Sequence, residues 1–268
     1  MKEIILTLEN PFYAYLFGLI QTDGHLYQNT RNRGRLSIEL SQRDEELLIK
    51  LQKALPFNSS LSRRKRNTNF SEDYHSAVWN VFDKRFRDFL IENGIPCGRK
   101  MDNITIPVCK YSKPDYFRGL IDGDGSLGLT GNGFPFISFI TKSPKIAFEY
   151  IDFIQSITKK VKTSSKNKRD GVFNIAVFKE DAQEIVNLLY YQNCLALQRK
   201  IMNAENVLRW KRPETMKRVE NRKRWTKSED DYILSNSVKD AMITLERSQK
   251  SIAMRFWRLK SDKQQVTD

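Results

Sequence analysis

Two stretches of this chain repeat one pattern, and that repeat constrains the fold more than any other feature of the sequence. Residues 16–24 and 117–125 each contain an apolar run with one internal glycine and close on Asp-Gly. Each pattern is typical of a helix that ends at its glycine. Because the two stretches are separated by roughly 100 residues, the sequence predicts two copies of one structural unit.

The internal glycines, Gly18 and Gly119, need an explanation. Glycine inside a helix costs roughly 0.5–1 kcal/mol relative to alanine, because it gives up the most backbone freedom. We interpret both as places where the two helices pack backbone against backbone, with no side chain between them. The closing glycines, Gly24 and Gly125, suit the left-handed residue that ends many helices.

The two closing acids, Asp23 and Asp124, are then placed at helix C-termini, where the helix dipole favours cations over carboxylates. If the helices pack side by side, the two carboxylates also repel each other. A divalent cation between them offsets both costs, and Mg²⁺ binds few carboxylates together with water and phosphate oxygens. The sequence therefore predicts a metal site formed by Asp23 and Asp124.

One copy alone would equally fit an ordinary core helix and turn; two copies favour a shared function. The stretches resemble the paired motifs of the single-chain LAGLIDADG homing endonucleases, since Gly-Leu-Ile-x-x-Asp-Gly occurs in both. Gln21 stands where that family commonly has Asp, as Asp122 does in the second copy, and Phe17 where a small residue is common. The acids that the family requires, Asp23 and Asp124, are both present. The resemblance implies a nuclease that uses Mg²⁺ or Mn²⁺ and cuts double-stranded DNA to leave 3′ overhangs.

A basic pair also recurs at nearly the same place in each copy, as Arg99-Lys100 and Arg199-Lys200. By resemblance, Lys100, which precedes an Ile-Pro pair, lies beside the metal site; Lys200 matches it by repeat position only. Either lysine could stabilise developing negative charge or position the attacking water, which would make both catalytic. The alternative is a surface lysine that anchors phosphate. We expect the two arginines to contact phosphate.

Both copies are expected to follow the same order: helix, two strands, helix, one or two strands, helix. The expected elements of the first copy are strands 25–27 and 35–40, helix 41–55, strand 74–82 and helix 85–92. Those of the second copy are strands 126–130 and 136–141, helix 144–160, strand 172–178 and helix 182–191. The expected fold is α+β, with two pseudo-symmetric αββαββα-type halves that form a DNA-binding saddle, plus a small all-α helix-turn-helix. We divide the chain into residues 1–110, 111–210, a basic linker 211–224, and 225–268.

The charge of the chain favours a polyanion as partner. Lys and Arg number 46 against 32 acids, a formal net charge of +14 with a pI near 9.6. Nucleic acid is the first candidate. No long apolar run or signal-like N-terminus favours a membrane, so we expect a cytoplasmic or organellar protein. The cysteines, Cys97, Cys109 and Cys194, lack paired spacing, which disfavours a zinc finger and suits a reducing compartment.

Polar strand faces are the expected DNA surface, because a curved sheet can enter the major groove, where all four base pairs are distinguishable. Arg31, Arg33 and Arg35 alternate as one face of a strand requires. The DNA-binding candidates of the first half are Gln28, Asn29, Arg31, Arg33, Arg35, Arg63, Arg64, Lys65 and Arg66; those of the second are Thr130, Asn132, Lys142, Lys166, Lys168 and Arg169. For any one of them the alternative is a solvated surface, and most contacts would be to phosphate.

The C-terminal segment changes character. Its linker is strongly basic and includes Arg222, Lys223 and Arg224, which we expect to lie along phosphates. Residues 225–230, Trp-Thr-Lys-Ser-Glu-Asp, then begin a unit that resembles a Myb-like helix-turn-helix. Its third helix is expected to bury Ile252, Phe256, Trp257 and Leu259 and to present Lys250, Arg255 and Arg258 to DNA. The alternative is a small helical cap on the main domain.

The main hypothesis is a monomeric, site-specific DNA endonuclease that hydrolyses phosphodiesters with divalent metal and recognises a long asymmetric site. A second is an RNA-splicing maturase on the same scaffold, with intron RNA as its partner. A third is a non-catalytic DNA-binding regulator. Two intact acids favour cleavage over both alternatives.

Overall fold

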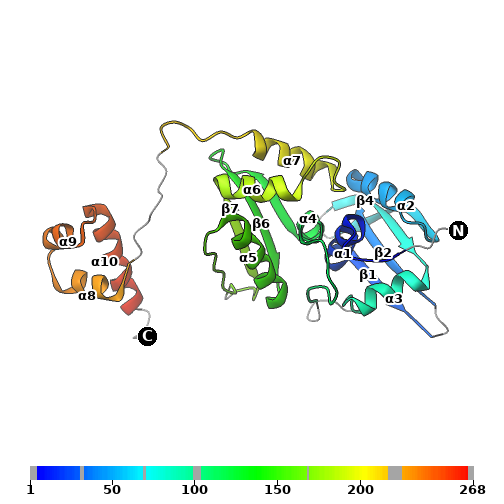
Figure 1. The fold of residues 1–268 in the computed structure, drawn as a ribbon, viewed down its shortest axis with the longest axis horizontal. Helices are drawn as coiled ribbons and strands as arrows, with labels where there is room; N and C mark the ends of the chain where they lie inside the picture. The colour runs from blue at the N-terminus through cyan, green and yellow to red at the C-terminus, as the bar shows by residue number, and fades with distance from the viewer. Residues whose placement is uncertain are drawn as a thin grey trace. The chain divides into compact units, whose positions relative to one another are not determined.

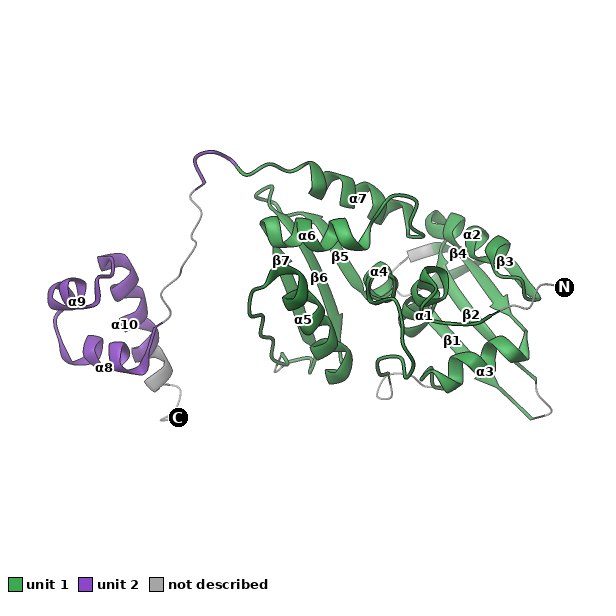
Figure 2. Cartoon of the chain, in the orientation of Figure 1, with its two compact units in different colours: residues 1–212 green, residues 213–268 purple. Residues whose placement is uncertain are grey.

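The computed structural model describes residues 5–30, 33–68, 71–98, 104–167, 169–216 and 225–264. The chain divides into two compact units, residues 1–212 and 213–268 (Figure 2). Most of the predicted basic linker, residues 217–224, lies outside the described residues. No helix in the described part of the chain is long and apolar enough to cross a membrane.

The first half of the larger unit follows the expected order. Helix α1 (Pro11–Asp23) leads into β1 (Gly24–Gln28) and β2 (Gly34–Ser41), which pair as the predicted hairpin. A 3₁₀ turn (Gln42–Asp44) and α2 (Glu45–Ala54) precede β3 (Ser59–Thr68), β4 (Ser71–Val81) and α3 (Lys84–Glu92). The strands form an antiparallel sheet in the order β1-β2-β4-β3. This half confirms the αββαββα prediction.

In the described residues, the second half repeats the first with one strand fewer and one α-helix more. It consists of α4 (Lys113–Asp124), β5 (Gly125–Leu129), β6 (Pro135–Thr141), α5 (Pro144–Thr158), β7 (Phe173–Phe178), α6 (Lys179–Leu189) and α7 (Gln198–Arg209). Its sheet has the order β5-β6-β7. In the place of β3, the described residues between α5 and β7 hold only an isolated bridge from Lys166 to Phe173. Of the one or two strands expected at this place, the second half therefore has one, because the Lys- and Ser-rich segment 159–172 lacks the alternating apolar residues that a paired strand buries.

The motif helices α1 and α4 lie side by side between the two sheets (Figure 1). Asn10 begins α1 by accepting a hydrogen bond from the Phe12 amide at 2.9 Å, with Pro11 next in the chain. A Cβ built on Gly18 would overlap the carbonyl oxygen of Tyr116, and one built on Gly119 would overlap that of Tyr15. The predicted backbone-to-backbone packing is confirmed.

The closing glycines do not adopt the left-handed conformation that the sequence suggested. Gly24 has φ −81° and Gly125 has φ −103°, both in the extended region, and each begins a strand. Glycine is needed there for space: a Cβ on Gly24 would come within 2.7 Å of the Ile20 carbonyl oxygen. The helix passes straight into the strand, so each motif acid marks the point where a helix ends and a sheet begins.

The smaller unit contains α8 (Lys227–Ser235), α9 (Val238–Leu245) and α10 (Gln249–Gln264). Thr226 and Glu229 form a capping box at the start of α8. Ile233, Ala241 and Ile252 form the core of the unit. Trp257 does not join them: its side chain is 69% exposed, so its assignment to the apolar side of the last helix is wrong. Phe256, one residue earlier, packs against the core instead.

Candidate metal site and nucleic-acid surface

The two motif acids meet where α1 and α4 end. Asp23 is the last residue of α1 and Asp124 the last residue of α4. A Cβ on Gly123 would lie 2.5 Å from Asp23 Oδ2, so the carboxylate of the first helix reaches the final turn of the second. The Thr22 hydroxyl donates to the same Asp23 oxygen at 2.9 Å. The packing of α1 on α4 thus brings the two acids together from distant parts of the sequence.

Asp124 is exposed and lines a surface hollow of about 380 Å³. Ile140, Thr141 and Lys142, at the end of β6, form part of its wall. Asp124 is therefore accessible from the side of the second sheet, and Lys142 lines the same hollow.

The donor set fits a metal that is shared with another molecule. The described residues contain no group of three or more His, Cys, Asp or Glu side chains that could hold an ion alone. Asp23 and Asp124 supply carboxylates from two helix ends. Mg²⁺ is commonly held by one or two carboxylates, with water and substrate phosphates completing its coordination. The pair suits that arrangement.

Lys200 lies directly behind this site. It is 4% exposed, in the first turn of α7, and its Nζ donates to the Gly125 carbonyl oxygen at 2.6 Å. Burial lowers the pKa of the Lys200 ammonium to about 8, against the opposing attraction of Asp122 and of Asp23. Lys200 is thus held against the residue that follows Asp124, within electrostatic reach of Asp23. The other lysine of the repeat, Lys100, and its neighbour Arg99 lie outside the described residues.

Arg199 is partly exposed and pairs with an acid of the first half. Its Nε lies 3.2 Å from both carboxylate oxygens of Asp44, in the 3₁₀ turn of the first half. Asp44 is buried, so the pair fastens the start of α7 to the other half of the unit. The expectation for Arg199 overlooked this partner because Asp44 is far away in the sequence.

A crossed set of hydrogen bonds behind the acids was not predicted. Tyr15 Oη of α1 donates to Asp122 Oδ2 of α4 at 2.7 Å, while Tyr116 Oη of α4 donates to Gln21 Oε1 of α1 at 2.6 Å. The two bonds occupy matching places in the repeat. Gln21 also donates to the Thr105 carbonyl oxygen at 2.7 Å. Gln21 differs from the Asp that is common at this position, but its side-chain oxygen still accepts the hydrogen bond from Tyr116.

The Asp122 carboxylate accepts more hydrogen bonds than the Gln21 side chain does. Besides Tyr15, it accepts from Tyr190 Oη and from the Leu197 amide, each at 2.7 Å. Asp122 is fully buried, and this burial raises the pKa of its carboxyl, although the three donors act against the rise. The Leu197 contact fixes the chain just before α7, which carries Lys200. Asp122 is thus a positioning residue for Lys200.

The basic run of β3 is divided between two faces of the first sheet. Arg64 and Arg66 pair across from Ser76 and Tyr74, on the face that also carries Arg35. The side chains of Arg63 and Lys65 point to the other face, which the helices cover. Arg63 Nε there binds Glu45 of α2 at 2.9 Å, and Lys65 pairs with Asp73 at 2.7 Å.

Glu39 lies between the arginines of the open face. Its carboxylate is 2.8 Å from Arg66 Nη2 and 3.7 Å from Arg64 Nη1, and it accepts from the Ser76 hydroxyl at 2.6 Å. The open face of the first sheet therefore has oriented guanidinium groups beside hydroxyl and amide side chains such as those of Ser37 and Asn80, which bond to each other at 2.6 Å.

The remaining first-half candidates lie at the tip of the hairpin. Gln28 ends β1, Asn29 follows it, and both are exposed. Arg33 precedes β2 and is not part of a strand, so the predicted alternation of Arg31, Arg33 and Arg35 along one strand is wrong. Of Arg33 and Arg35, only Arg35 is a strand residue, and Arg31 lies outside the described residues.

The described second-half candidates lie beside the strands of the sheet and not within them. Asn132 is exposed in the turn between β5 and β6, and Lys142 follows β6. Lys166 and Arg169 are exposed in the segment before β7, where Arg169 Nε binds Asp170 at 2.9 Å. Lys168 lies outside the described residues. In this half the candidate cations that are described therefore border the sheet.

In the smaller unit, Lys250 and Arg258 are exposed on α10. Arg255 faces inward: its Nη2 is 2.6 Å from Asp230 Oδ2 of α8. Arg247, which precedes α10, pairs with buried Glu229 at 2.9 Å and stacks on the Trp225 ring 3.8 Å from its centre. The predicted linker contacts Arg222, Lys223 and Arg224 lie outside the described residues.

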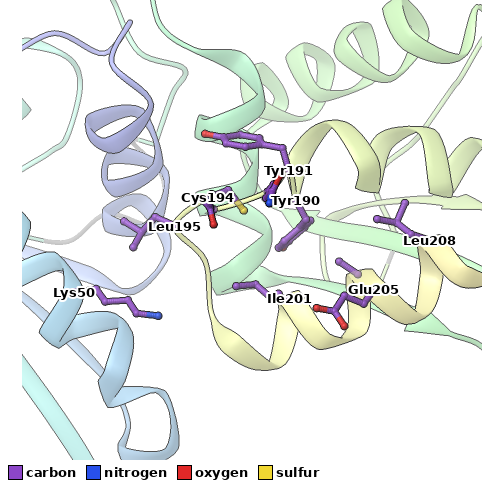
Figure 3. A pocket seen from close by; sticks show the side chains of 11 residues that line it. Lys50, Tyr190, Tyr191, Cys194, Leu195, Ile201, Glu205 and Leu208 are labelled. Atoms are coloured by element: carbon purple, nitrogen blue, oxygen red, sulfur yellow. The ribbon is translucent and has the colours of Figure 1, made fainter.

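A second hollow, of about 570 Å³, lies between α2, the segment 190–195 and α7 (Figure 3). Lys50 enters it from α2 and Glu205 from α7, with Cys194 between the two helices. None of its lining residues is a motif acid, so it is separate from the candidate metal site.

The comparisons with known proteins agree with this architecture. The family model described as a LAGLIDADG-like domain matches residues 12–85, most of the first half. The larger unit has a mixed α/β fold with antiparallel sheets that matches the folds of LAGLIDADG homing endonucleases. No curated protein matches the chain.

Two solved structures carry the fold comparison. One is the homing endonuclease I-WcaI bound to its DNA recognition sequence, at 15% identity and a TM-score of 0.51, covering 75% of this chain and 88% of that one. The other is I-DmoI in complex with DNA and Ca, at 15% identity and a TM-score of 0.50, covering 74% of this chain and 99% of that one. At this identity the likeness establishes the fold.

Proposed function

We propose that this protein is a site-specific endonuclease that cuts double-stranded DNA with divalent metal ions, Mg²⁺ or Mn²⁺, held between Asp23 and Asp124. The observation that supports the proposal is that Asp23 and Asp124 are the last residues of two helices packed backbone to backbone. A net charge of +14 suits a polyanionic substrate. The two solved structures with this fold, I-WcaI and I-DmoI, are bound to DNA, which supports the same substrate.

The residues of the chain divide the work as follows. Asp23 and Asp124 each supply a carboxylate to the metal site, one from each half, so that each half serves one strand. The metal, when bound, activates water and stabilises the leaving oxygen. Lys200 holds the chain just after Asp124 and places a positive charge behind the acids. Asp122 and Tyr15 hold that arrangement in place through buried hydrogen bonds.

The two sheets supply the recognition surface. Arg35, Arg64 and Arg66 on the open face of the first sheet suit guanine edges and phosphates. Because the two halves differ in sequence and strand number, the target is asymmetric. Both halves belong to one chain, so a monomer contains a complete site. By resemblance, the product is a double-strand break with 3′ overhangs.

The smaller unit acts as a helix-turn-helix that adds DNA contacts through Lys250 and Arg258 on α10. Both residues are exposed, whereas Arg255 forms an ion pair with Asp230. Joined to the main unit by a basic linker, such a module increases affinity by raising the local concentration of the second binding event.

The test is strand cleavage by the variants Asp23→Asn and Asp124→Asn. Targets are first selected by cleavage of a randomised duplex library with the full chain and Mg²⁺, and the ends are sequenced. Each variant should bind the selected duplex as the wild type does but cut it at least about 100-fold more slowly, since each removes a charge from the metal site. EDTA should abolish wild-type cleavage.

Asp152→Asn is the matched control, because Asp152 is exposed on α5, away from the motif helices, and should leave cleavage unchanged. Undiminished cutting of both strands by either motif variant refutes the assignment. Specific binding by the wild type without any metal-dependent cutting identifies a DNA-binding regulator instead.

A further inference from the structure

The open faces of the two sheets differ in chemistry. The strands of the second sheet, β5, β6 and β7, carry no charged residue, although the chain as a whole is 29% charged. The open face of the first sheet, by contrast, carries Arg35, Arg64 and Arg66. A pseudo-symmetric pair of sheets therefore presents a cationic face in one half and a neutral face in the other.

The neutral face also exposes large apolar side chains. Ile140 is 44% exposed and Phe178 is 50% exposed, while their neighbours Phe139 and Val177 are buried in the core. By register, Ile140 lies opposite Asn174, and Ser138 lies between Ser126 and Ala176. Side chains two residues apart share a face, so Ile140 and Ser138 point the same way. The face thus combines apolar surface with small hydroxyl and amide groups.

This face continues into the candidate metal site and is bordered by cations. Ile140 and Lys142 line the same hollow as Asp124. Lys166 is exposed beside β7. A phosphate backbone that followed these lysines past Asp124 would bring the edges of the base pairs over the neutral face. The lysines at the border suit the anionic phosphates of DNA, and the neutral face between them suits its partly apolar bases.

We propose that the second sheet recognises its half of the target through the methyl groups of thymine. The proposal rests on the endonuclease function above and specifies the base composition of that half-site. In the major groove, the C5 methyl of thymine is the apolar feature that a base pair presents, and Ile140 contacts it there. Guanine O6 and N7 against Ile140 would lose water without gaining a hydrogen bond.

The target is therefore asymmetric in a defined way. The half-site under the second sheet is rich in thymine at the positions that Ile140 and Phe178 reach. The half-site under the first sheet contains guanines that arginines read. Because apolar contacts release no counterions, binding to the second half-site depends less on salt than binding to the first.

The experiment selects duplexes from a randomised pool with the full-chain Asp23→Asn variant and Ca²⁺, then replaces thymine by deoxyuridine in one half-site at a time. That replacement removes the methyl group and nothing else. Affinity should fall about fourfold for each contacted thymine of the second half-site, the factor expected for one methyl group returned to water. The same replacement in the first half-site should leave affinity unchanged.

Two variants locate the effect. Ile140→Asn in the Asp23→Asn background should weaken binding to the thymine duplex and remove its advantage over the deoxyuridine duplex. Ile5→Asn, at a side chain 74% exposed outside both sheets, is the matched control and should bind as the parent does. Circular dichroism of both variants checks that they fold.

Three outcomes overturn the proposal. One is a selected site whose second half lacks thymine, or equal sensitivity to deoxyuridine in both halves. Another is self-association that sedimentation detects in the parent and that Ile140→Asn abolishes, since the face then binds a second copy of the chain. The last is a pool with no enriched sequence at all; this result removes the endonuclease function as well, whereas the first two leave it standing.

Discussion

Replacing Lys200 by methionine separates the stability of the larger unit from its chemistry. The methionine side chain has nearly the length of the lysine stem but carries no charge. Lys200 is 4% exposed, and its Nζ donates a hydrogen bond to the Gly125 carbonyl oxygen at 2.6 Å. The variant therefore removes a buried ammonium group together with a hydrogen bond worth about 1 kcal/mol.

The size of the effect follows from the pKa of Lys200, which burial lowers from 10.5 to about 8. Between these values the unfolded chain binds more protons than the folded chain, so the stability of the wild type rises with pH across this window, by at most about 1.4 kcal/mol per pH unit. From pH 7 to pH 9.5 the gain is about 2 kcal/mol. The methionine variant lacks it. At pH 7, where the wild type still carries the cost of a buried charge, the variant should be at least as stable.

The assay is urea unfolding of both proteins at pH 7 and pH 9.5. In the difference between the two free energies of unfolding, the titration of all other groups cancels. The free energy of unfolding of the wild type relative to Lys200→Met should rise by about 2 kcal/mol between the two pH values. DNA cleavage at pH 7 should fall at least about 100-fold in the variant.

Lys53→Met is the matched control for this assay, because Lys53 is exposed on α2 and should show no such change with pH. A variant that is less stable than the wild type by the same amount at both pH values would show that Lys200 is only a packing residue and would refute the reasoning.

Two further predictions concern packing within each unit. Gly18→Ala should lower the free energy of unfolding by about 3 kcal/mol, because the added Cβ would overlap the backbone of Tyr116. The control Gly131→Ala should lower it by less than about 0.5 kcal/mol, because no atom lies within 4 Å of the added Cβ. Equal losses in denaturant unfolding would contradict the backbone-to-backbone packing. Glu229→Ala breaks the capping box and leaves Arg247 buried without its partner, so it should destabilise residues 213–268 by about 3 kcal/mol in hydrogen exchange while the protection of residues 1–212 stays unchanged. Loss of protection in both units would show that they unfold together.

The sequence was sufficient where the evidence was local or repeated. The recurrence of Gly18 and Gly119 within matching apolar stretches predicted close helix packing, because only a glycine backbone permits it at that cost in helix stability. The same repeat placed Asp23 and Asp124 at equivalent helix ends. Most element types of the first half followed from the periodicity of apolar residues.

Register decided what the composition of the strands could not. Arg63 and Arg64 are adjacent and chemically alike, yet one binds Glu45 on the helical side of β3 and the other lies on the open face. A period of two residues separates them, and only the pairing with β4 shows which face is covered. A run of basic residues therefore predicted the charge of the sheet but not the side from which DNA can reach it.

Distant partners account for the remaining differences. The sequence alone determined that two equivalent helices end in acids and pack through glycines, since apolar periodicity and the lack of a side chain act within a few residues. Only the tertiary structure decided that Lys200 is buried against Gly125, that Arg199 is bound to Asp44, and that Asp122 collects three donors. Each of these depends on groups that chain folding brings together from across the sequence, and burial, which sets both pKa and access, is a property of that assembled environment.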